Sequence, residues 1–307
     1  MKKIQPYSWE AFRLPFAACS LLLFPLLTAG LLAPGALSLI VSLDFSFLWP
    51  LMLCGFLWGV TAIFFDQAIL QVGLALTYGI AFGISASLGS LLALPFTGAR
   101  LSAVAIGWMI AGTVLVLGGV WLMTKAGWLN QPVSSSPSRM KKGVLLAVLS
   151  GLGSAAMNIG YAYASPLTHM AQQRGATPLG ASLTGWIPIF WGGFLPTLVY
   201  TLWRLVRLKT YRCYGAPGSA CALCRAVGAS ALWFLAMAGY SFAVSQLGAM
   251  GPVTGWAVFT SLTLMVSHVW AVKFHEWQEK RAMPFLYGGN ALLLFAFICL
   301  AAAQSVA

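Results

Sequence analysis

Long apolar segments recur along the chain and dominate what it can fold into. Nine of them lie at residues 12–32, 47–69, 73–97, 101–124, 143–164, 182–206, 226–247, 251–272 and 284–303. Each has about the 20 apolar residues that an α-helix needs to cross the hydrocarbon core of a bilayer. Only 7% of the residues are charged, against about 25% in soluble globular domains. The sequence therefore predicts an all-α, polytopic membrane protein with nine transmembrane helices embedded in a lipid bilayer.

Basic residues are distributed very unevenly between the two sets of loops. Loops on one side of the predicted membrane hold fifteen Lys and Arg, whereas the loops on the other side hold only Arg100 and Arg174. Since basic loops stay on the cytoplasmic side, we expect a cytoplasmic N-terminus and a C-terminus on the opposite side. The net charge of +12 lies at the ends of apolar segments and not along one face, which argues against nucleic acid as a partner.

Two stretches of the chain match each other at a separation of 175 residues. Leu57-Trp58 and residues 68–73 in the first stretch correspond to Leu232-Trp233 and residues 243–248 in the second. The two stretches cross the predicted membrane in opposite directions, so the repeat is inverted, as in many secondary transporters. This predicts a transporter with a first half at residues 1–125, a basic linker at 126–142 and a second half at 143–307.

The two predicted halves differ in their number of helices. The first half holds four apolar segments and the second half holds five. A repeat of five helices needs one more helix before residue 12. We therefore expect a ten-helix, inverted-repeat transporter fold that lacks its first helix.

Seven short stretches, in order along the chain, resemble the L-rhamnose–proton symporters of the drug/metabolite transporter superfamily. They are Tyr7-Ser8-Trp9-Glu10, Leu57-Trp58-Gly59-Val60, the series Gly73, Gly79, Gly83 and Gly89, then Lys141–Val148, Ser154–Met157, Ser165-Pro166 and His275-Glu276-Trp277. The resemblance implies ten helices in two inverted halves. It also implies uptake of a deoxyhexose together with a proton across a bacterial inner membrane, which would make the C-terminus periplasmic.

Some positions depart from the family pattern. Ala62, Phe64 and Ala162 stand where family members carry asparagine, and the predicted penultimate helix begins with the apolar sequence at 251–256. A sugar needs several hydrogen-bond partners in a dry site. An exporter of drugs or metabolites, which the same superfamily contains, is therefore the alternative prediction.

Two ionisable residues inside predicted spans are candidates for proton coupling. Asp66 lies about one turn from the cytoplasmic end of the second segment, and His268 lies in the eighth. Ionisable groups at membrane depth are costly and commonly functional. A carboxylate can carry the coupling proton, and a neutral imidazole can relay it or pair with Asp66. The alternatives are a carboxylate that reaches water and a histidine that only packs.

Aromatic and amide side chains within the spans are candidates for substrate binding. Flat rings pack on the apolar face of a sugar, while amides bind its hydroxyl groups. Helix packing and interfacial belts are the competing explanation, because the chain has 13 Trp residues. The candidates are Trp58, Tyr78, Asn158, Tyr161, Trp233 and Trp256.

Other chemistry finds little support in the sequence. Cys213, Cys221 and Cys224 cluster in one predicted cytoplasmic loop, but the loop offers no fourth ligand for a closed zinc site. A redox-sensing or metal-binding role for them is a minor alternative. No nucleotide-binding motif or catalytic set is found. We therefore expect no enzyme activity, no metal and no cofactor other than the coupling proton; the sequence does not specify an oligomeric state.

Overall fold

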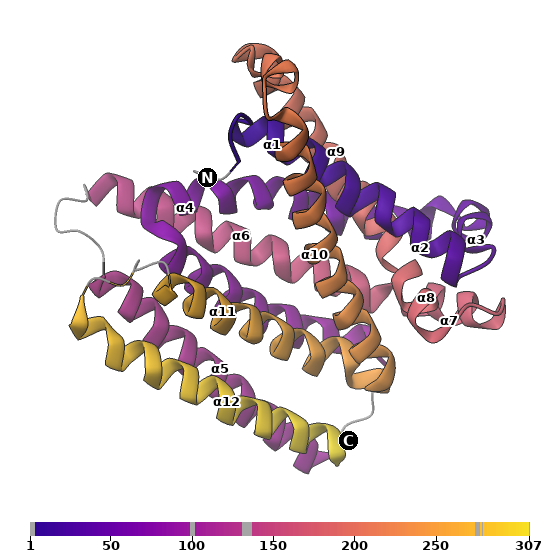
Figure 1. Ribbon diagram of the computed structural model, residues 1–307. Coiled ribbons are helices and arrows are strands. Elements are labelled where there is room, and N and C mark those ends of the chain that lie inside the picture. Colours follow the sequence, from indigo (N-terminus) through magenta and orange to yellow (C-terminus); the bar gives the residue numbers. More distant parts are fainter. Residues whose placement is uncertain (1–3, 99–101, 131–136, 274–276, 278, 307) are drawn as a thin grey trace. The chain divides into compact units, whose positions relative to one another are not determined.

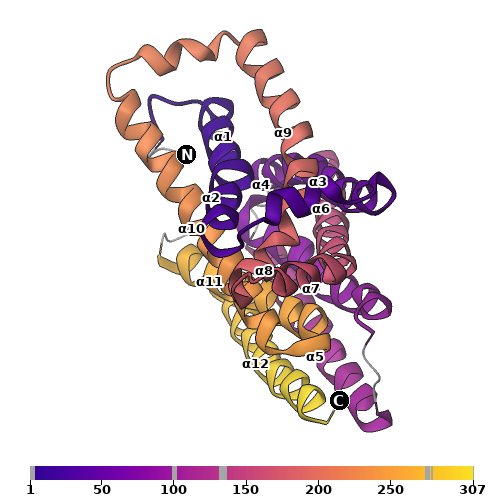
Figure 2. The same ribbon diagram turned by 90° about the vertical axis from the view of Figure 1, so that its right-hand side faces the viewer.

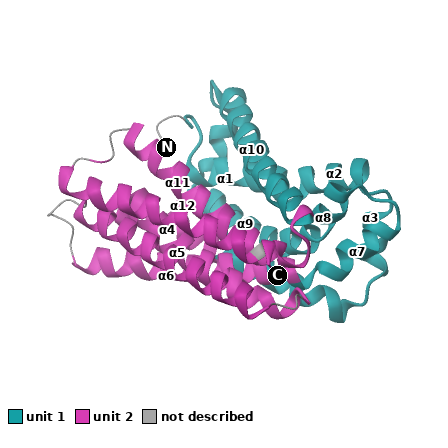
Figure 3. Ribbon diagram, turned by 90° about the horizontal axis from the view of Figure 1, so that it is seen from below, with its two compact units in different colours: residues 1–60, 163–245 teal, residues 61–162, 246–307 magenta. Residues whose placement is uncertain are grey.

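The computed structural model contains helices joined by short turns (Figure 1). It describes residues 4–98, 102–130, 137–273, 277 and 279–306. The chain divides into two compact units, residues 1–60 with 163–245, and residues 61–162 with 246–307 (Figure 3). Each unit combines two segments that are far apart in the sequence.

The described residues include eight helices that are long and apolar enough to cross a membrane. They are Trp9–Leu32, Phe45–Phe96, Ala103–Leu129, Pro137–Gln173, Pro178–Arg207, Ser219–Gln246, Gly248–Lys273 and Lys280–Ala303. The prediction of a polytopic, helical membrane protein is confirmed. Two of the nine predicted segments, 47–69 and 73–97, fall within the single element Phe45–Phe96.

The first unit is built around helices α9 and α10. Its elements are α1 (Trp9–Ala18), the π-helix η1 (Cys19–Leu23), α2 (Phe24–Leu32), α3 (Ala36–Ser42), the start of α4 (Phe45–Ala93), α7 (Ser165–Gln173), α8 (Pro178–Thr184), α9 (Trp186–Arg207), the 3₁₀ turn η3 (Thr210–Gly215) and α10 (Ser219–Gln246). Glycines let α4 and α9 approach closely. A Cβ on Gly55 would overlap the Ile189 carbonyl, and one on Gly59 would overlap the Gly193 carbonyl.

The second unit contains the rest of α4, η2 (Leu94–Phe96), α5 (Ala103–Leu129), α6 (Pro137–Tyr163), η4 (Gly248–Met250), the π-helix η5 (Gly251–Gly255), α11 (Trp256–Lys273), η6 (Lys280–Ala282) and α12 (Met283–Ser305). Helices α5 and α12 lie side by side (Figure 1). At one end the Ser102 hydroxyl donates to the Val306 carbonyl over 2.8 Å. At the other end the Glu279 amide donates to the Asn130 side chain over 3.2 Å. These two contacts show that the helices are antiparallel.

Helix α4 reverses direction at Gly73. Phe65 and Tyr78 are 13 residues apart, a distance of about 20 Å along a straight helix, yet their ring centroids lie 5.0 Å apart. The chain turns back through Gly73, whose φ of 80° and ψ of 171° belong to a region that is essentially restricted to glycine. The second and third apolar segments, 47–69 and 73–97, are therefore joined by a tight hairpin.

Candidate substrate and proton-coupling site

The repeat-related tryptophans lie together in the first unit. The rings of Trp58 on α4 and Trp233 on α10 stack, with centroids 5.9 Å apart and planes at 24°. Phe16 and Phe190 contact the Trp233 ring from two other helices, at 6.5 Å and 5.8 Å. Both tryptophans are half-buried. The four rings form a cluster, here called the aromatic cluster, in which Trp58 and Trp233 each keep part of their surface exposed.

Helix α9 fixes the Trp58 ring of the aromatic cluster. A Cβ on Gly193 would come within 2.8 Å of the Trp58 ring, so the absence of a side chain at this position leaves room for the indole. About two turns earlier on α9, Trp186 donates a 2.8 Å hydrogen bond from its indole nitrogen to the Ser241 hydroxyl. The position of the stacked pair thus depends on close packing between helices.

Asn158 on α6 has its amide hydrogens bound to backbone carbonyls. The side chain is fully buried, and its Nδ2 donates to the Gly89 carbonyl over 3.0 Å and to the Pro252 carbonyl over 2.9 Å. These bonds fasten α6 to α4 and to the π-helix η5. In this conformation the Asn158 donors hold helices together.

Trp256 contacts the same part of α4. Its indole nitrogen lies 3.0 Å from the Ser85 hydroxyl and 3.2 Å from the Ser85 carbonyl. A Cβ on Gly89 would come within 2.7 Å of this nitrogen. Trp256 and Asn158, which the sequence marked separately, therefore converge on residues 85–89.

Tyr78 and Asp66 are neighbours across the α4 reversal. The Tyr78 ring packs against Phe65 and Phe82, at centroid distances of 5.0 Å and 5.1 Å. The Asp66 carboxylate is close enough to interact electrostatically with the Tyr78 hydroxyl, and Asp66 is half-buried. Tyr161 on α6 is also buried, with 5% of its surface exposed.

His268 on α11 is buried, and one ring nitrogen has a defined partner. Its Nδ1 lies 2.8 Å from the Leu264 carbonyl, so Nδ1 carries the hydrogen and Nε2 is the nitrogen available to accept a proton. The Nε2 atom and the indole nitrogen of Trp277, whose rings lie 5.8 Å apart, are both buried without a hydrogen-bond partner in the described part of the chain.

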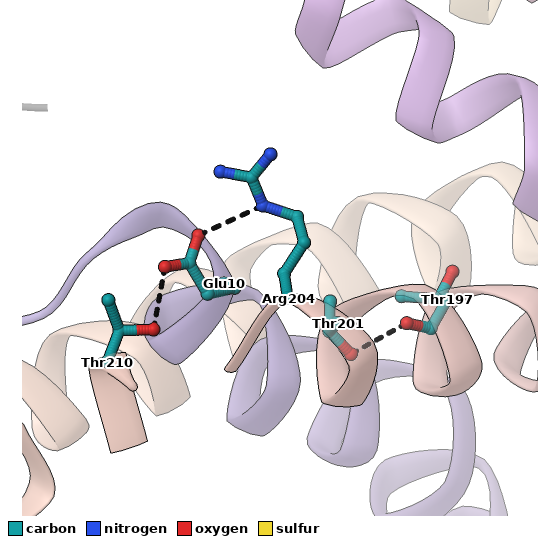
Figure 4. A network of polar contacts seen from close by, with 5 residues as sticks. All are labelled: Glu10, Thr197, Thr201, Arg204 and Thr210. Carbon is teal, nitrogen blue, oxygen red and sulfur yellow. Dashed lines mark hydrogen bonds and ion pairs between the residues drawn. The ribbon is translucent and has the colours of Figure 1, made fainter. Parts of the chain in front are cut away.

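Glu10 is a buried acidic residue that the sequence analysis missed. The predicted first span began at residue 12, whereas α1 begins at Trp9 and places Glu10 in its first turn. Glu10 thus joins Asp66 as an acidic residue within a helix that is long and apolar enough to cross a membrane. Glu10 is only 2% exposed and accepts hydrogen bonds from Arg204 Nε at 3.2 Å and from the Thr210 hydroxyl at 2.8 Å (Figure 4). The Tyr7–Glu10 motif was the one sequence signal that pointed to it.

The loop cysteines are free thiols. Cys221 and Cys224 are exposed, and Cys213 is half-buried beside Tyr7 and Tyr214. Burial, with smaller contributions from Cys213, raises the pKa of Tyr214 to about 12. The neutral Tyr214 hydroxyl donates to the Ala11 carbonyl over 3.0 Å. Among the described residues, no group of three His, Cys, Asp or Glu side chains could hold a metal ion.

A small pocket lies within the second unit, lined by α4, α5, η5, α11 and α12. Its walls are mainly apolar, with the hydroxyl groups of Ser87, Ser90 and Thr113. Ser87 and Thr113 donate to carbonyls of their own helices. None of the predicted substrate-binding residues lines this pocket.

Comparison with known proteins places the chain among transporters. The model of the L-rhamnose–proton symport protein family matches residues 1–305. The L-rhamnose–proton symporter of Cronobacter sakazakii is 27% identical over 295 residues, 92% of this chain and 85% of that protein. The protein of the same name from Klebsiella pneumoniae is 26% identical over 308 residues, 96% of this chain and 90% of that protein.

The match includes all the candidate residues described above and nearly the whole of both compact units. The family is one of symporters, not of enzymes. With an Escherichia coli relative of the same name the identity is 25% over 302 residues, 92% of this chain and 86% of that protein. The aromatic cluster, the α4 reversal and the buried Glu10 thus lie in a chain that belongs to the L-rhamnose–proton symport protein family.

Proposed function

We propose that this protein takes up L-rhamnose, or a closely related sugar, together with a proton across a bacterial inner membrane. The observation that carries the proposal is the stacking of Trp58 on Trp233. Two stretches that match at a separation of 175 residues meet at this pair, and their half-buried rings offer an apolar face for a deoxysugar. The names of the relatives favour this activity over export of drugs or metabolites.

The proposed architecture is nine membrane crossings arranged as an inverted repeat. The reversal at Gly73 supports counting two crossings in Phe45–Phe96. Helices α5 and α12 occupy equivalent places in the repeat, and their antiparallel arrangement agrees with an inverted relation. The halves 1–125 and 143–307 are then related by the repeat but do not coincide with the two compact units, because each compact unit contains segments from both halves.

The proposed orientation follows from the basic residues. Fifteen Lys and Arg lie in one set of loops and two in the other, which places the N-terminus in the cytoplasm and the C-terminus in the periplasm. The two halves would rock about a central site and expose it to each side in turn.

Asp66 is the proposed carrier of the coupling proton. It lies half-buried within a membrane helix beside Tyr78. His268 is a second candidate and would accept a proton at Nε2. Its Nδ1 is bound to a backbone carbonyl, so Nε2 is the atom that would relay the proton or pair with Asp66. The proton is the only coupling species in the proposal, and no other cofactor is required.

Substrate binding is assigned to six residues in two groups. Trp58 and Trp233 would stack on the sugar ring. Tyr78, Asn158, Tyr161 and Trp256 would supply polar contacts in other states of the transport cycle, once the helix contacts seen here have rearranged.

Uptake of labelled L-rhamnose tests the proposal. Cells that lack their own transporter and express this chain should accumulate the sugar, and a protonophore should abolish the accumulation. Asp66→Asn should still bind the sugar but fail to concentrate it. The matched control is Asp44→Asn, which removes an exposed carboxylate and should transport normally. An inserted protein that accumulates no L-rhamnose would refute the substrate, and full accumulation by Asp66→Asn would exclude Asp66.

A further inference from the structure

Positive charge is concentrated where α9 ends and turns into η3. Arg204, Arg207, Lys209 and Arg212 fall within nine residues, and no Asp or Glu occurs anywhere between residues 67 and 275. Figure 2 shows this segment as the arch that joins α9 to α10. The surrounding sequence therefore provides cations without counter-ions.

Only one of these four cations is neutralised by the ion pair described above. Glu10 binds Arg204. The other three residues, Arg207, Lys209 and Arg212, are exposed and are here called the basic turn. The guanidinium of Arg207 lies over the exposed Trp203 ring, 4.9 Å from its centroid, which leaves its hydrogen-bond donors available. The basic turn thus presents an accessible site for an anion.

Lys209 adds an independent observation from the backbone. It is the one non-glycine residue with positive φ among the described residues, at 53°. This left-handed conformation disfavours every residue that carries a Cβ, and glycine is the usual choice just beyond a helix end. Strained residues kept in such positions are often functional. Lys209 occupies this position although glycine would relieve the backbone.

Apolar side chains surround the basic turn. Trp203, Val206, Leu208 and Tyr211 are 50%, 70%, 50% and 49% exposed. Trp and Tyr beside basic residues are typical of the interface between membrane and water. The combination of exposed apolar groups and cations that have no counter-ion among the described residues fits a ligand that has both an acyl chain and a negative headgroup.

We propose that the basic turn binds the phosphate headgroup of an anionic phospholipid, with the apolar side chains around it contacting the acyl chains. The lipid phosphate supplies the counter-ion that the chain lacks between residues 67 and 275. This inference rests on the membrane placement of α9 and is independent of the transported substrate. It also explains why Lys stands at position 209.

Lipid binding by the full-length protein in neutral detergent tests the proposal. Native mass spectrometry would compare phosphatidylglycerol with phosphatidylcholine of the same acyl chains, without sugar or proton gradient. Each basic side chain near an anionic surface contributes about a fivefold change in binding. The variant Arg207→Gln/Lys209→Gln/Arg212→Gln should therefore bind phosphatidylglycerol roughly 100-fold more weakly. The same lipid should bind the unaltered protein more tightly than phosphatidylcholine.

A matched control removes three charges elsewhere. Lys141, Lys142 and Lys280 are exposed, and their replacement by Gln changes the net charge equally. This control should retain phosphatidylglycerol binding within about threefold. Equal losses in both triple variants would mean non-specific attraction and would overturn the proposal. So would equal binding of the two lipids, or displacement of phosphatidylglycerol by millimolar inorganic phosphate, which would indicate a free-phosphate site.

Lys209→Gly separates the side chain from its backbone strain. The variant should unfold at a higher temperature, because glycine accepts the left-handed conformation, and should bind phosphatidylglycerol about fivefold more weakly. Unchanged lipid affinity would exclude Lys209 from the site. Failure of sugar transport would leave these measurements unaffected, so the two proposals are tested separately.

Discussion

Replacing Arg204 should destabilise the protein more than replacing Glu10, although the two residues form one ion pair. The reason is their unequal burial, since Glu10 is 2% exposed and Arg204 is 30% exposed. Arg204→Met leaves the Glu10 carboxylate buried. Of its two hydrogen-bond partners drawn in Figure 4, only Thr210 then remains. Glu10→Gln leaves a guanidinium that can turn toward water, and the new amide oxygen can still accept from Thr210.

The magnitudes follow from this asymmetry. Removing one partner of a buried ion pair costs about 3–5 kcal/mol, and partial exposure of Arg204 moves its loss to the low end, about 3 kcal/mol. Glu10→Gln loses one charge-assisted hydrogen bond and keeps a neutral one. Its expected cost is about 1 kcal/mol.

Thermal denaturation of the purified variants in a neutral detergent checks this order. Arg207→Met makes the same chemical change one turn onward, at an exposed residue, and should stay within about 0.5 kcal/mol of the unaltered protein. A Glu10→Gln variant that is as unstable as Arg204→Met, or more so, would refute the argument from burial.

Three further predictions concern packing and protonation. Gly193→Ala should cost about 1–3 kcal/mol of stability and weaken sugar binding, because the new Cβ would meet the Trp58 ring at 2.8 Å. Gly239→Ala is the control, since its Cβ would meet nothing within 4 Å. Normal uptake by Gly193→Ala would contradict the role of the stacked pair. Asn158→Ala should cost about 2–3 kcal/mol through two lost hydrogen bonds, and a higher KM with unchanged thermal stability would instead indicate direct substrate contact. Folding raises the pKa of Tyr214 from 10 to about 12, so the neutral phenol contributes fully to stability below pH 10, and this contribution is lost as pH rises through 12. Tyr214→Phe should therefore flatten the fall in melting temperature over this range. An unchanged pH profile would exclude Tyr214 as the source of that fall.

The membrane helices could be predicted from the sequence because hydropathy adds up over some 20 residues. A single polar residue scarcely changes such a sum, so the spans were found and their ends were less certain. The beginning of α1 shows the consequence. The predicted first span began at residue 12 and left Glu10 outside it, whereas the helix starts at Trp9 and buries the carboxylate.

Contacts between distant residues could not be predicted in the same way. The partner of Glu10 lies 194 residues away, and nothing local marks Arg204 out from its basic neighbours. Asn158 and Trp256 were identified as polar groups in apolar helices, but a single sequence does not reveal that their donors meet α4. For Trp58 and Trp233 the internal repeat indicated equivalent positions, and the place of the Trp58 ring depends on Gly193 of a third helix.

The backbone at Gly73 also bears on which mutations the chain can tolerate. Every amino acid reachable from a glycine codon by one base change carries a Cβ, and all are excluded at φ 80° and ψ 171°. In a saturation mutagenesis screen, position 73 should stand out as intolerant of every substitution. Gly107, Gly228 and Gly239, where a Cβ would meet nothing within 4 Å, should accept alanine freely. The hairpin on which the proposed count of membrane crossings depends would thus be visible from genetic selection alone.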